Sequence, residues 1–317
     1  MITRLRTVAI LAVLLIFAIP ASQASFWETF KSITGQATTG AFNATIDVGN
    51  TPPNLSIATT APTTLDLNEN TITIVTVNGT ISDADGVANL GSGASVTINF
   101  SLVSSSVQSI NYGIGTTPRV NTSCRLTDIS DLYARNYSCS VEFWYFDPPS
   151  ANWLITVAGR DINGAQNTTS TTYTVNQLTA VVLGPANMTW PSLALGAVNQ
   201  SSTNPLLVNN TGNANITFVN LTAFDVSKSG GNDYIPAENF SVSSTQALSC
   251  WTGGGAANFT ANATNVSLAN VSVLRGNYSQ ADNLFGQRSL YLCLRQVPTT
   301  ISAGRYASQR SWVLTIG

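Results

Sequence analysis

The stretch Ser95-Val-Thr-Ile-Asn-Phe-Ser-Leu102 decides the fold class of this chain. Its apolar residues occupy every second position from Val96 to Leu102, which is the pattern of a β-strand with one buried face. Asn99 starts an Asn-X-Ser sequon and falls on the opposite face, where it would point to solvent. The segment predicts an all-β protein whose strands bury one face in a core and present the other to a glycosylated surface.

Runs of the same style continue on both sides, rich in Val, Ile, Thr and aromatic residues and separated by Gly, Pro, Asp and Asn. This rhythm is typical of sandwiches, and the length suits two domains. We therefore expect two tandem β-sandwiches, residues 51–178 and 179–317. Within Thr71–Val77 the alternation changes phase between Ile74 and Val75, which predicts a β-bulge. The strands expected in the first domain are 71–81, 95–102, 107–114, 119–127, 137–145, 153–157 and 171–175; those in the second are 180–183, 205–209, 216–224, 240–244, 266–274, 289–294 and 311–316.

The first 50 residues differ from the rest. Residues 1–24 have two arginines, an apolar run of about a dozen residues and a small-residue site ending at Ala24, which is the order of a secretory signal peptide. An uncleaved anchor or a pilin-like leader is the alternative. Residues 25–50 then predict a short helix, a connector and a possible exchangeable strand. In that strand Phe42, Ala44, Ile46 and Val48 alternate with polar residues, so they are the candidate subunit contacts.

The amino-acid composition excludes several classes of function. Charged residues make up 9% of the chain, the net charge is −2, and there is no histidine. Phosphate binding requires clustered Lys and Arg, so nucleic acid is excluded as the main partner. Without histidine, Ser-His-Asp and Cys-His catalysis and the His-based zinc sites are also excluded. We expect no catalytic residues, no cofactor, and no transmembrane segment in the mature chain.

Sequons are unusually frequent. Asn-X-Ser/Thr occurs more than twice as often as the content of Asn, Ser and Thr would give by chance. In an exported chain this pattern marks surface positions that receive N-linked glycans. The candidate sites are Asn43, Asn54, Asn78, Asn99, Asn121, Asn136, Asn167, Asn187, Asn199, Asn209, Asn215, Asn220, Asn239, Asn258, Asn262, Asn265, Asn270 and Asn277.

The four cysteines predict disulfides, because the chain is exported. Cys124 and Cys139 lie in strand-like sequence on either side of a polar stretch centred at Asp131-Leu132, where a hairpin would place them opposite each other. Cys250 and Cys293 would then form the second pair. The other two connectivities stay open from the sequence alone.

Two short loops contain oxygen ligands two residues apart before a glycine, Asp83-Ala-Asp85-Gly86 and Asp161-Ile-Asn163-Gly164. Calcium loops share this spacing, so Asp83, Asp85, Asp161 and Asn163 are weak calcium candidates. The same sequences are ordinary turns in which Asp and Asn side chains cap the backbone, and we favour that interpretation. Trp144, Trp153, Trp190, Trp251 and Trp312 could form a sugar-binding platform. We expect most of them to be buried in the core, because Trp153 and Trp312 begin runs in which alternate residues are apolar.

Two motifs carry a resemblance to known families. The run Phe146-Asp-Pro-Pro-Ser-Ala-Asn-Trp-Leu-Ile-Thr-Val157, with Gly159-Arg-Asp-Ile-Asn-Gly164 after it, resembles the closing strands of immunoglobulin-like and cadherin-like modules of prokaryotic surface proteins. Val208-Asn-Asn-Thr-Gly-Asn-Ala-Asn-Ile-Thr217 is similar to the opening of CARDB-type adhesion modules. Together with Ile33-Thr-Gly-Gln-Ala-Thr38, the style resembles archaeal secreted and S-layer-like proteins. The resemblance implies that the two tandem sandwiches are immunoglobulin-like and that the protein is located at the cell surface.

The leading hypothesis is a structural glycoprotein of a cell-envelope layer, filament or pilus, secreted and self-assembling through strand edges or the N-terminal strand. The alternative is an adhesin or carbohydrate-binding surface module. An exposed aromatic patch and saturable ligand binding by a monomer would indicate the adhesin or carbohydrate-binding module.

Overall fold

We describe the fold from a computed structural model, which defines residues 43–58, 63–102, 119–246, 250, 256–281 and 283–317. Met1–Gly49 and Asn50–Gly317 form two separate units, and every strand named below belongs to the second. The defined residues are almost entirely strands and turns, with three short 3-10 helices, η1 (Val87–Leu90), η2 (Ala237–Asn239) and η3 (Tyr278–Gln280). Within them, no helix has the length and hydropathy to cross a membrane. The expected signal peptide and N-terminal helix lie outside the described residues.

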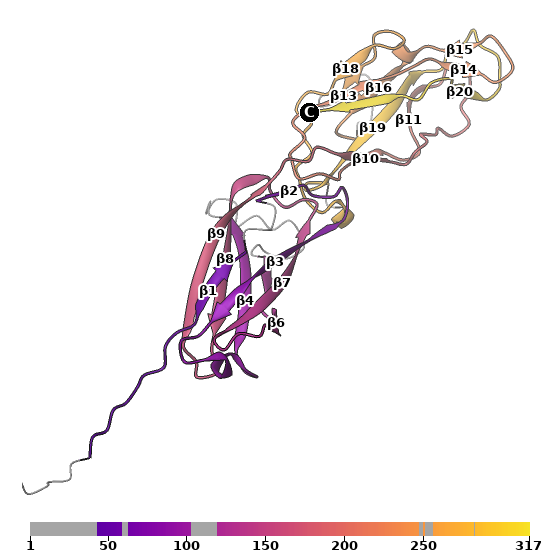
Figure 1. Ribbon diagram of the computed structural model, residues 1–317. Helices are drawn as coiled ribbons and strands as arrows, with labels where there is room; N and C mark the ends of the chain where they lie inside the picture. Colours follow the sequence, from indigo (N-terminus) through magenta and orange to yellow (C-terminus); the bar gives the residue numbers. More distant parts are fainter. Residues whose placement is uncertain (1–42, 59–62, 103–118, 247–249, 251–255, 282) are drawn as a thin grey trace, which may run out of the picture. The chain divides into compact units, whose positions relative to one another are not determined.

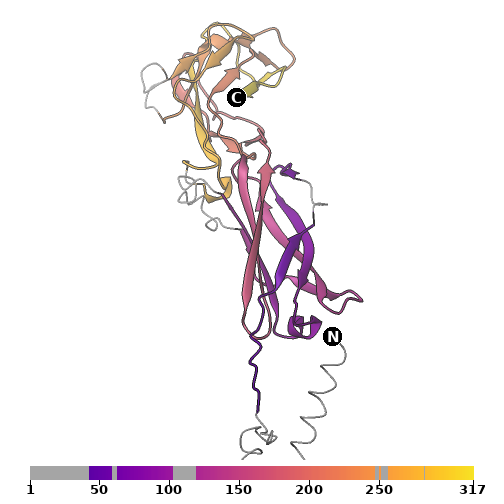
Figure 2. The ribbon, with the colours of Figure 1, turned by 60° about the vertical axis from the view of Figure 1, so that its left-hand side comes forward.

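Two sheets make the first half of the compact unit, and the views of Figures 1 and 2 show them as two layers. The strand order is β1-β3-β7-β6 in one sheet and β2-β9-β8-β4-β5 in the other. Their inward side chains form one hydrophobic cluster between the layers, so this half is a β-sandwich. The strands are β1 (Asn54–Ile57), β2 (Thr64–Leu65), β3 (Ile72–Ser82), β4 (Ser95–Leu102), β5 (Arg119–Asn121), β6 (Arg125–Asp128), β7 (Ala134–Trp144), β8 (Ser150–Arg160) and β9 (Gln166–Val175).

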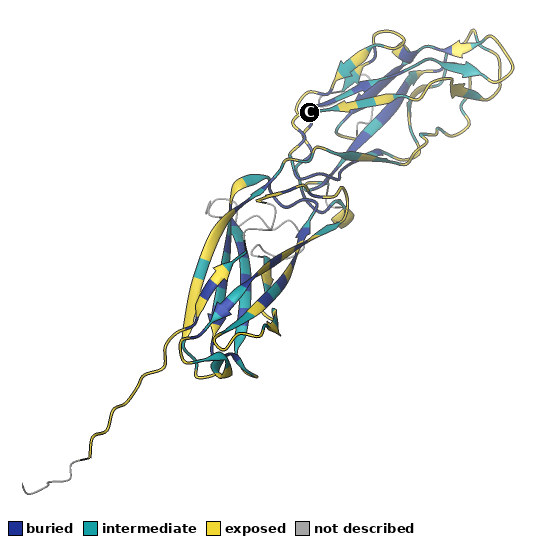
Figure 3. Ribbon diagram, in the orientation of Figure 1, coloured by how far each residue is buried: buried dark blue, intermediate teal, exposed yellow. Residues whose placement is uncertain are grey.

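Strand β4 has the bounds and the inward face that its sequence predicts. Its alternate residues from Val96 to Leu102 are at most 3% exposed. Phe100 packs edge-on against Phe143 of β7 at 5.1 Å between ring centroids, and Phe143 packs against Trp153 of β8 at 5.2 Å. Edge-to-face aromatic pairs add to the free energy gained by burial. Figure 3 shows the resulting alternation of buried and exposed residues along the strands.

The predicted bulge at Ile74 and Val75 is wrong. Strand β3 pairs with β7 in an unbroken antiparallel register from Ile72 to Ser82. Ile74 points to the outer face and is 65% exposed, whereas Val75 is buried. The apparent change of phase in the sequence therefore arises because Ile74 is an apolar residue on the solvent face of a regular strand.

The run 119–127 was expected as one strand, but it contributes to both sheets. Strand β5 pairs with β4, and β6 pairs with β7 in the opposite layer. The chain crosses between them at a turn in which Ser123 N donates to Asn121 Oδ1 at 2.8 Å. Such a side-chain cap competes with continued strand pairing. The strand expected at 107–114 lies outside the described residues.

The hairpin of β6 and β7 has the predicted centre. Arg125 lies opposite Ser138 and Asp128 opposite Arg135, so the turn is centred between Asp131 and Leu132. The same register places Cys124 opposite Cys139, and the two are joined by a disulfide with their Cα atoms 4.5 Å apart.

The second half of the unit is more irregular. Its main sheet has the order β10-β12-β19-β16-β17, with β11 also pairing with β19, and two three-stranded sheets have the orders β18-β13-β21 and β15-β14-β20. A second hydrophobic cluster lies among these sheets, separate from the first. The strands are β10 (Val181–Gly184), β11 (Val198–Ser201), β12 (Leu206–Asn210), β13 (Val219–Thr222), β14 (Val226–Lys228), β15 (Tyr234–Ile235), β16 (Phe240–Ser243), β17 (Ala257–Asn258), β18 (Asn265–Ser267), β19 (Gln287–Gln296), β20 (Tyr306–Ser308) and β21 (Val313–Ile316).

Here the expected strand 266–274 is mostly irregular. Only its first residues belong to β18, and Val273 forms an isolated bridge with Ile216. Asn270 adopts a positive φ of 59°, a left-handed conformation that a continuous strand does not contain. The chain turns at this residue instead of extending.

A polar loop joins the two halves. Asn210, Thr211 and Asn213 are completely buried, and all three are hydrogen bonded. Asn213 accepts from Leu178 N at 2.6 Å and donates to Asn176 O at 2.8 Å, while Thr211 Oγ1 donates to Glu69 at 2.6 Å. Buried polar groups whose hydrogen bonds are all satisfied favour a single packing of the segments they join. The Asn-Asn-Thr-Gly-Asn motif thus links the first cluster to the second inside one compact unit.

Candidate functional site

Residues 43–49 form an extended segment, which we call the arm. The sequence predicts a half-buried strand at 41–48, but the defined residues of the arm belong to no strand. Ala44 is exposed, and Ile46 and Val48 are 83% and 85% exposed, more than any other large hydrophobic side chains in the described chain. Phe42 lies outside the described residues. The apolar alternation of the arm is therefore present in the sequence, but none of the described residues covers it.

The compact unit begins at Asn50, whose side chain is tightly held. Its Nδ2 donates to Asp161 Oδ2 at 2.7 Å, and its Oδ1 accepts from Asn163 Nδ2 at 3.2 Å. Next to it, Thr51 N donates to Asp85 Oδ2 at 2.7 Å. The sequence holds no signal for this role, because the partners of Asn50 lie 111 and 113 residues further along the chain.

The two loops proposed as calcium candidates thus meet at the root of the arm. Their oxygen atoms accept hydrogen bonds from the chain, as the turn interpretation predicts: Asp83 Oδ1 from Asp85 N at 2.8 Å, and Asp161 Oδ1 from Ala165 N at 2.9 Å. Asp83 Oδ2 is buried without a protein partner. Among the described residues, no group of three or more Asp, Glu, His or Cys is arranged to hold a metal ion.

The charge of Asp161 is stabilised by these donors. Desolvation acts to raise the pKa of its carboxyl group, but hydrogen bonds from the Asn50 side chain and from the backbone of residues 163–165 outweigh it. The pKa consequently lies below its ordinary value. Asp161 is ionised at neutral pH and serves to anchor the first residue of the compact unit.

The candidate glycosylation sites divide by burial into three groups. Most are on the surface, four are half-buried, and Asn209 and Asn277 are only 9% and 7% exposed. Asn209 accepts from Gln287 Nε2 at 2.8 Å, and Asn277 caps η3 by accepting from Ser279 N at 3.1 Å. The half-buried sites are Asn99, Asn121, Asn220 and Asn239; the exposed sites are Asn43, Asn54, Asn78, Asn136, Asn167, Asn187, Asn199, Asn215, Asn258, Asn262, Asn265 and Asn270.

If the chain is glycosylated, occupancy is expected to follow this division. Mass spectrometry of glycopeptides from the native protein should find sugar at the exposed sites and none at Asn209 or Asn277, because a glycan there would displace buried hydrogen-bonded side chains. Exposed Asn167, on β9, is the internal reference. Equal occupancy at Asn209 and Asn167 would contradict the expectation.

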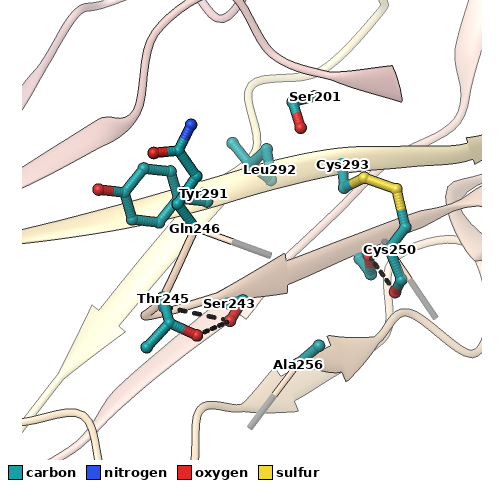
Figure 4. Close-up of a pocket in the computed structure, with 10 residues that line it drawn as sticks. Ser201, Ser243, Thr245, Gln246, Cys250, Ala256, Tyr291, Leu292 and Cys293 are labelled. Atoms are coloured by element: carbon teal, nitrogen blue, oxygen red, sulfur yellow. Dashed lines mark hydrogen bonds between the residues drawn. A yellow bond between two sulfur atoms is a disulfide. The ribbon is translucent and has the colours of Figure 1, made fainter. Parts of the chain in front are cut away.

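The second disulfide joins Cys250 to Cys293 of β19, with the Cα atoms 5.6 Å apart. Beside it is a small hollow lined by hydroxyl groups, which Figure 4 shows between β16 and β19. Ser243 and Thr245 share a hydrogen bond of 3.2 Å on its wall. No carboxylate, histidine or free thiol lines the hollow, so its described walls offer hydrogen bonds but no acid, base or nucleophile.

The described tryptophans support the cores, as their sequence pattern predicts. Trp153 is completely buried, and Trp190 and Trp312 pack against the second cluster, each edge-on to Phe240. Trp144 stacks on buried Phe146. Trp27 and Trp251 lie outside the described residues. The indole rings in the described chain are committed to internal packing rather than to a sugar-binding platform.

The sequence matches no known protein family and no curated protein. Solved structures do match, among them one described as "Chaperone-tip adhesin complex is vital for synergistic activation of CFA/I fimbriae biogenesis". That alignment covers 83% of this chain and 79% of the other, at 11% sequence identity and a TM-score of 0.27. Similarity of this degree supports no statement about function, and the all-β fold rests on the strands described above.

Proposed function

We propose that this protein is a non-catalytic structural glycoprotein of a cell-envelope layer or extracellular filament of the archaeal type, and that its subunits are joined by the arm. The observation that carries the proposal is the exposure of Ile46 and Val48 on a segment with strand periodicity and no strand partner. Burying each side chain would contribute about 1.5–3 kcal/mol. Pairing with a neighbouring subunit would also satisfy the backbone groups of the arm.

The proposed domain type is an immunoglobulin-like sandwich. In the first half, the strands β1, β3, β7 and β6 lie in the order A-B-E-D, and β9, β8 and β4 in the order G-F-C. This is the order of immunoglobulin-type sandwiches. The disulfides support export, because such bonds persist in oxidising compartments. Exposed sequons on both halves suit a glycosylated outer surface.

The test is assembly of arm variants. Deleting residues 26–49 is expected to abolish filaments or lattices in electron micrographs while residues 50–317 remain folded. Ile46→Asp, and separately Val48→Asp, should do the same, because a charge would have to be buried at the subunit contact. Gly49→Asp is the matched control, since it adds the same charge on the other face of the arm with nothing within 4 Å of the new Cβ.

The expected outcome is loss of polymers in the Ile46 and Val48 variants and normal polymers in the Gly49 variant. Circular dichroism and the two intact disulfides verify folding. Polymers that persist after deletion of the arm would overturn the proposal. A monomer at all concentrations that binds a sugar saturably would favour the adhesin alternative instead.

A further inference from the structure

The two halves of the compact unit share the order of their main sheets. In the first half it is β1-β3-β7-β6, and in the second it is β10-β12-β19-β16. Corresponding strands follow the same chain order, and each pair of neighbours is antiparallel in both halves. The second half is therefore built on the same plan as the first, with additional short strands.

The opposite sheets share a pair of strands as well. In the first half, Ile98-Asn-Phe-Ser101 of β4 lies against Trp153-Leu-Ile-Thr-Val157 of β8. In the second, Val219-Asn-Leu-Thr222 of β13 lies against Val313-Leu-Thr-Ile316 of β21, and Trp312 directly precedes that strand. Ile98 faces Val157, and Val219 faces Ile316. Sequence and register identify β21 as the counterpart of β8.

The two strands differ in what covers them. Strand β8 lies between β4 and β9, whereas within the described residues β21 pairs with β13 alone. Strand β9 buries Tyr173 and Val175 in the first core. Consistent with this cover, Ile155 and Val157 of β8 are at most 2% exposed, but the corresponding Leu314 and Ile316 are only half-buried. In the part of the chain that the structure describes, no strand lies beside β21 in the place that β9 takes beside β8.

The open edge of β21 also presents backbone groups. Phe218 and Gly317 exchange both of their backbone hydrogen bonds, at 3.1 and 3.4 Å. Because such pairs alternate along an antiparallel ladder, Thr315 and Val313 bond to β13 and the backbone groups of Leu314 and Ile316 point away from it. Their side chains meanwhile rest on the second hydrophobic cluster. One strand added here would satisfy the free groups and extend the cover of the core.

We propose that the added strand is the arm of a second copy of this chain, residues 43–48 lying along β21. This inference rests on the proposed function and names its acceptor. Ala44, Ile46 and Val48 would cover the half-buried side chains of β21, and Thr45 and Asp47 would face solvent. The arm has no proline within 43–48, so all its N–H groups are available, and Pro52-Pro53 follows beyond its end.

The acceptor can be tested by cross-linking. All four native cysteines are in disulfides, so introduced thiols are the only free ones. Asp47→Cys is combined in the full chain with Val313→Cys or with Thr315→Cys, the two outward positions of β21, so that one of them neighbours the arm in either register. The control combines Asp47→Cys with Val182→Cys on β10, an edge strand of the main sheet; Val182 is 46% and Val313 50% exposed.

Under mild oxidation, a β21 pair is expected to give a ladder of multimers on a non-reducing gel, at least tenfold above the β10 pair. Equal ladders at β10 and β21, no β21 ladder, or a cross-link within single chains would each overturn the acceptor. Assembly of the Ile46→Asp variant distinguishes failure of the proposed acceptor from failure of the proposed function. If that variant fails to polymerise and β21 does not cross-link, only the acceptor is wrong; if it polymerises normally, the proposed function fails.

Discussion

Replacing Arg119 with alanine is expected to lower the free energy of unfolding by about 3–5 kcal/mol at neutral pH, because it removes the guanidinium that is bonded to a buried carboxylate. Arg119 binds Asp147 through two nitrogens, Nε to Oδ2 at 3.0 Å and Nη2 to Oδ1 at 2.5 Å. The Asp147 side chain is 2% exposed, it also accepts from Trp144 N at 2.8 Å, and the charge of Arg275 acts to lower its pKa. A backbone donor does not replace the two charge-assisted hydrogen bonds of Arg119.

The loss at Arg119 should shrink in acid. Desolvation raises the pKa of Asp147 above its ordinary value even though Arg119 opposes the shift, so the folded state holds this proton more tightly than the unfolded state. Between the ordinary and the raised pKa, stability therefore falls as pH rises. Removing Arg119 takes away a lowering influence and widens that window. Once Asp147 is protonated it has no charge that needs a partner, so the loss of Arg119 costs less stability.

The measurement is denaturation by guanidinium at pH 7 and near pH 4, each variant compared with the wild type at the same pH. Asp147→Asn is the control, since it removes the buried charge and makes the Arg119→Ala change nearly independent of pH in the double variant. An equal loss from Arg119→Ala at both pH values would show that packing of the arginine, rather than its charge, stabilises the site.

Local pattern predicts much of the first sandwich because its information is contained in short segments. Strand β4 follows from alternation within eight residues, and the β6–β7 hairpin from the spacing of Cys124 and Cys139 about a polar turn. Where the sequence pattern predicted the wrong local structure, contacts between distant segments determined the observed one. Ile74 has an apolar side chain on the solvent face, which alternation cannot distinguish from a bulge.

The candidate sites show the same limit. A sequon does not reveal that Asn209 lies in a buried pair with Gln287, because the partner is 78 residues away. The arm is the opposite case: its alternation predicts a strand, yet no strand forms among its defined residues in the single chain. Periodicity states that a segment needs a partner, but not which molecule supplies it. The sequence of the arm therefore indicates a contact but not its acceptor, which is indicated by the difference in cover between β21 and β8.

The two corresponding tryptophans are expected to differ in their contribution to stability. Trp153→Ala should cost about 3–5 kcal/mol, since the ring is fully buried against Phe143 and its Nε1 donates to Pro148 O at 3.0 Å. Trp312→Ala should cost roughly half as much. The Trp312 indole also has a carbonyl partner, Phe224 O at 3.0 Å, but the ring is only half-buried.

Both substitutions are best measured by guanidinium denaturation in the Ile46→Asp background, where the protein is monomeric by the proposal. In assembled wild-type material, an arm lying along β21 would bury the second core further, so the loss from Trp312→Ala should grow toward that from Trp153→Ala. Equal losses already in the monomer would mean that the second core is closed without a partner. The difference between the losses that Trp312→Ala causes in monomer and in polymer thus tests whether the edge of β21 is covered. It does so through a core residue, independently of any cross-link at the surface.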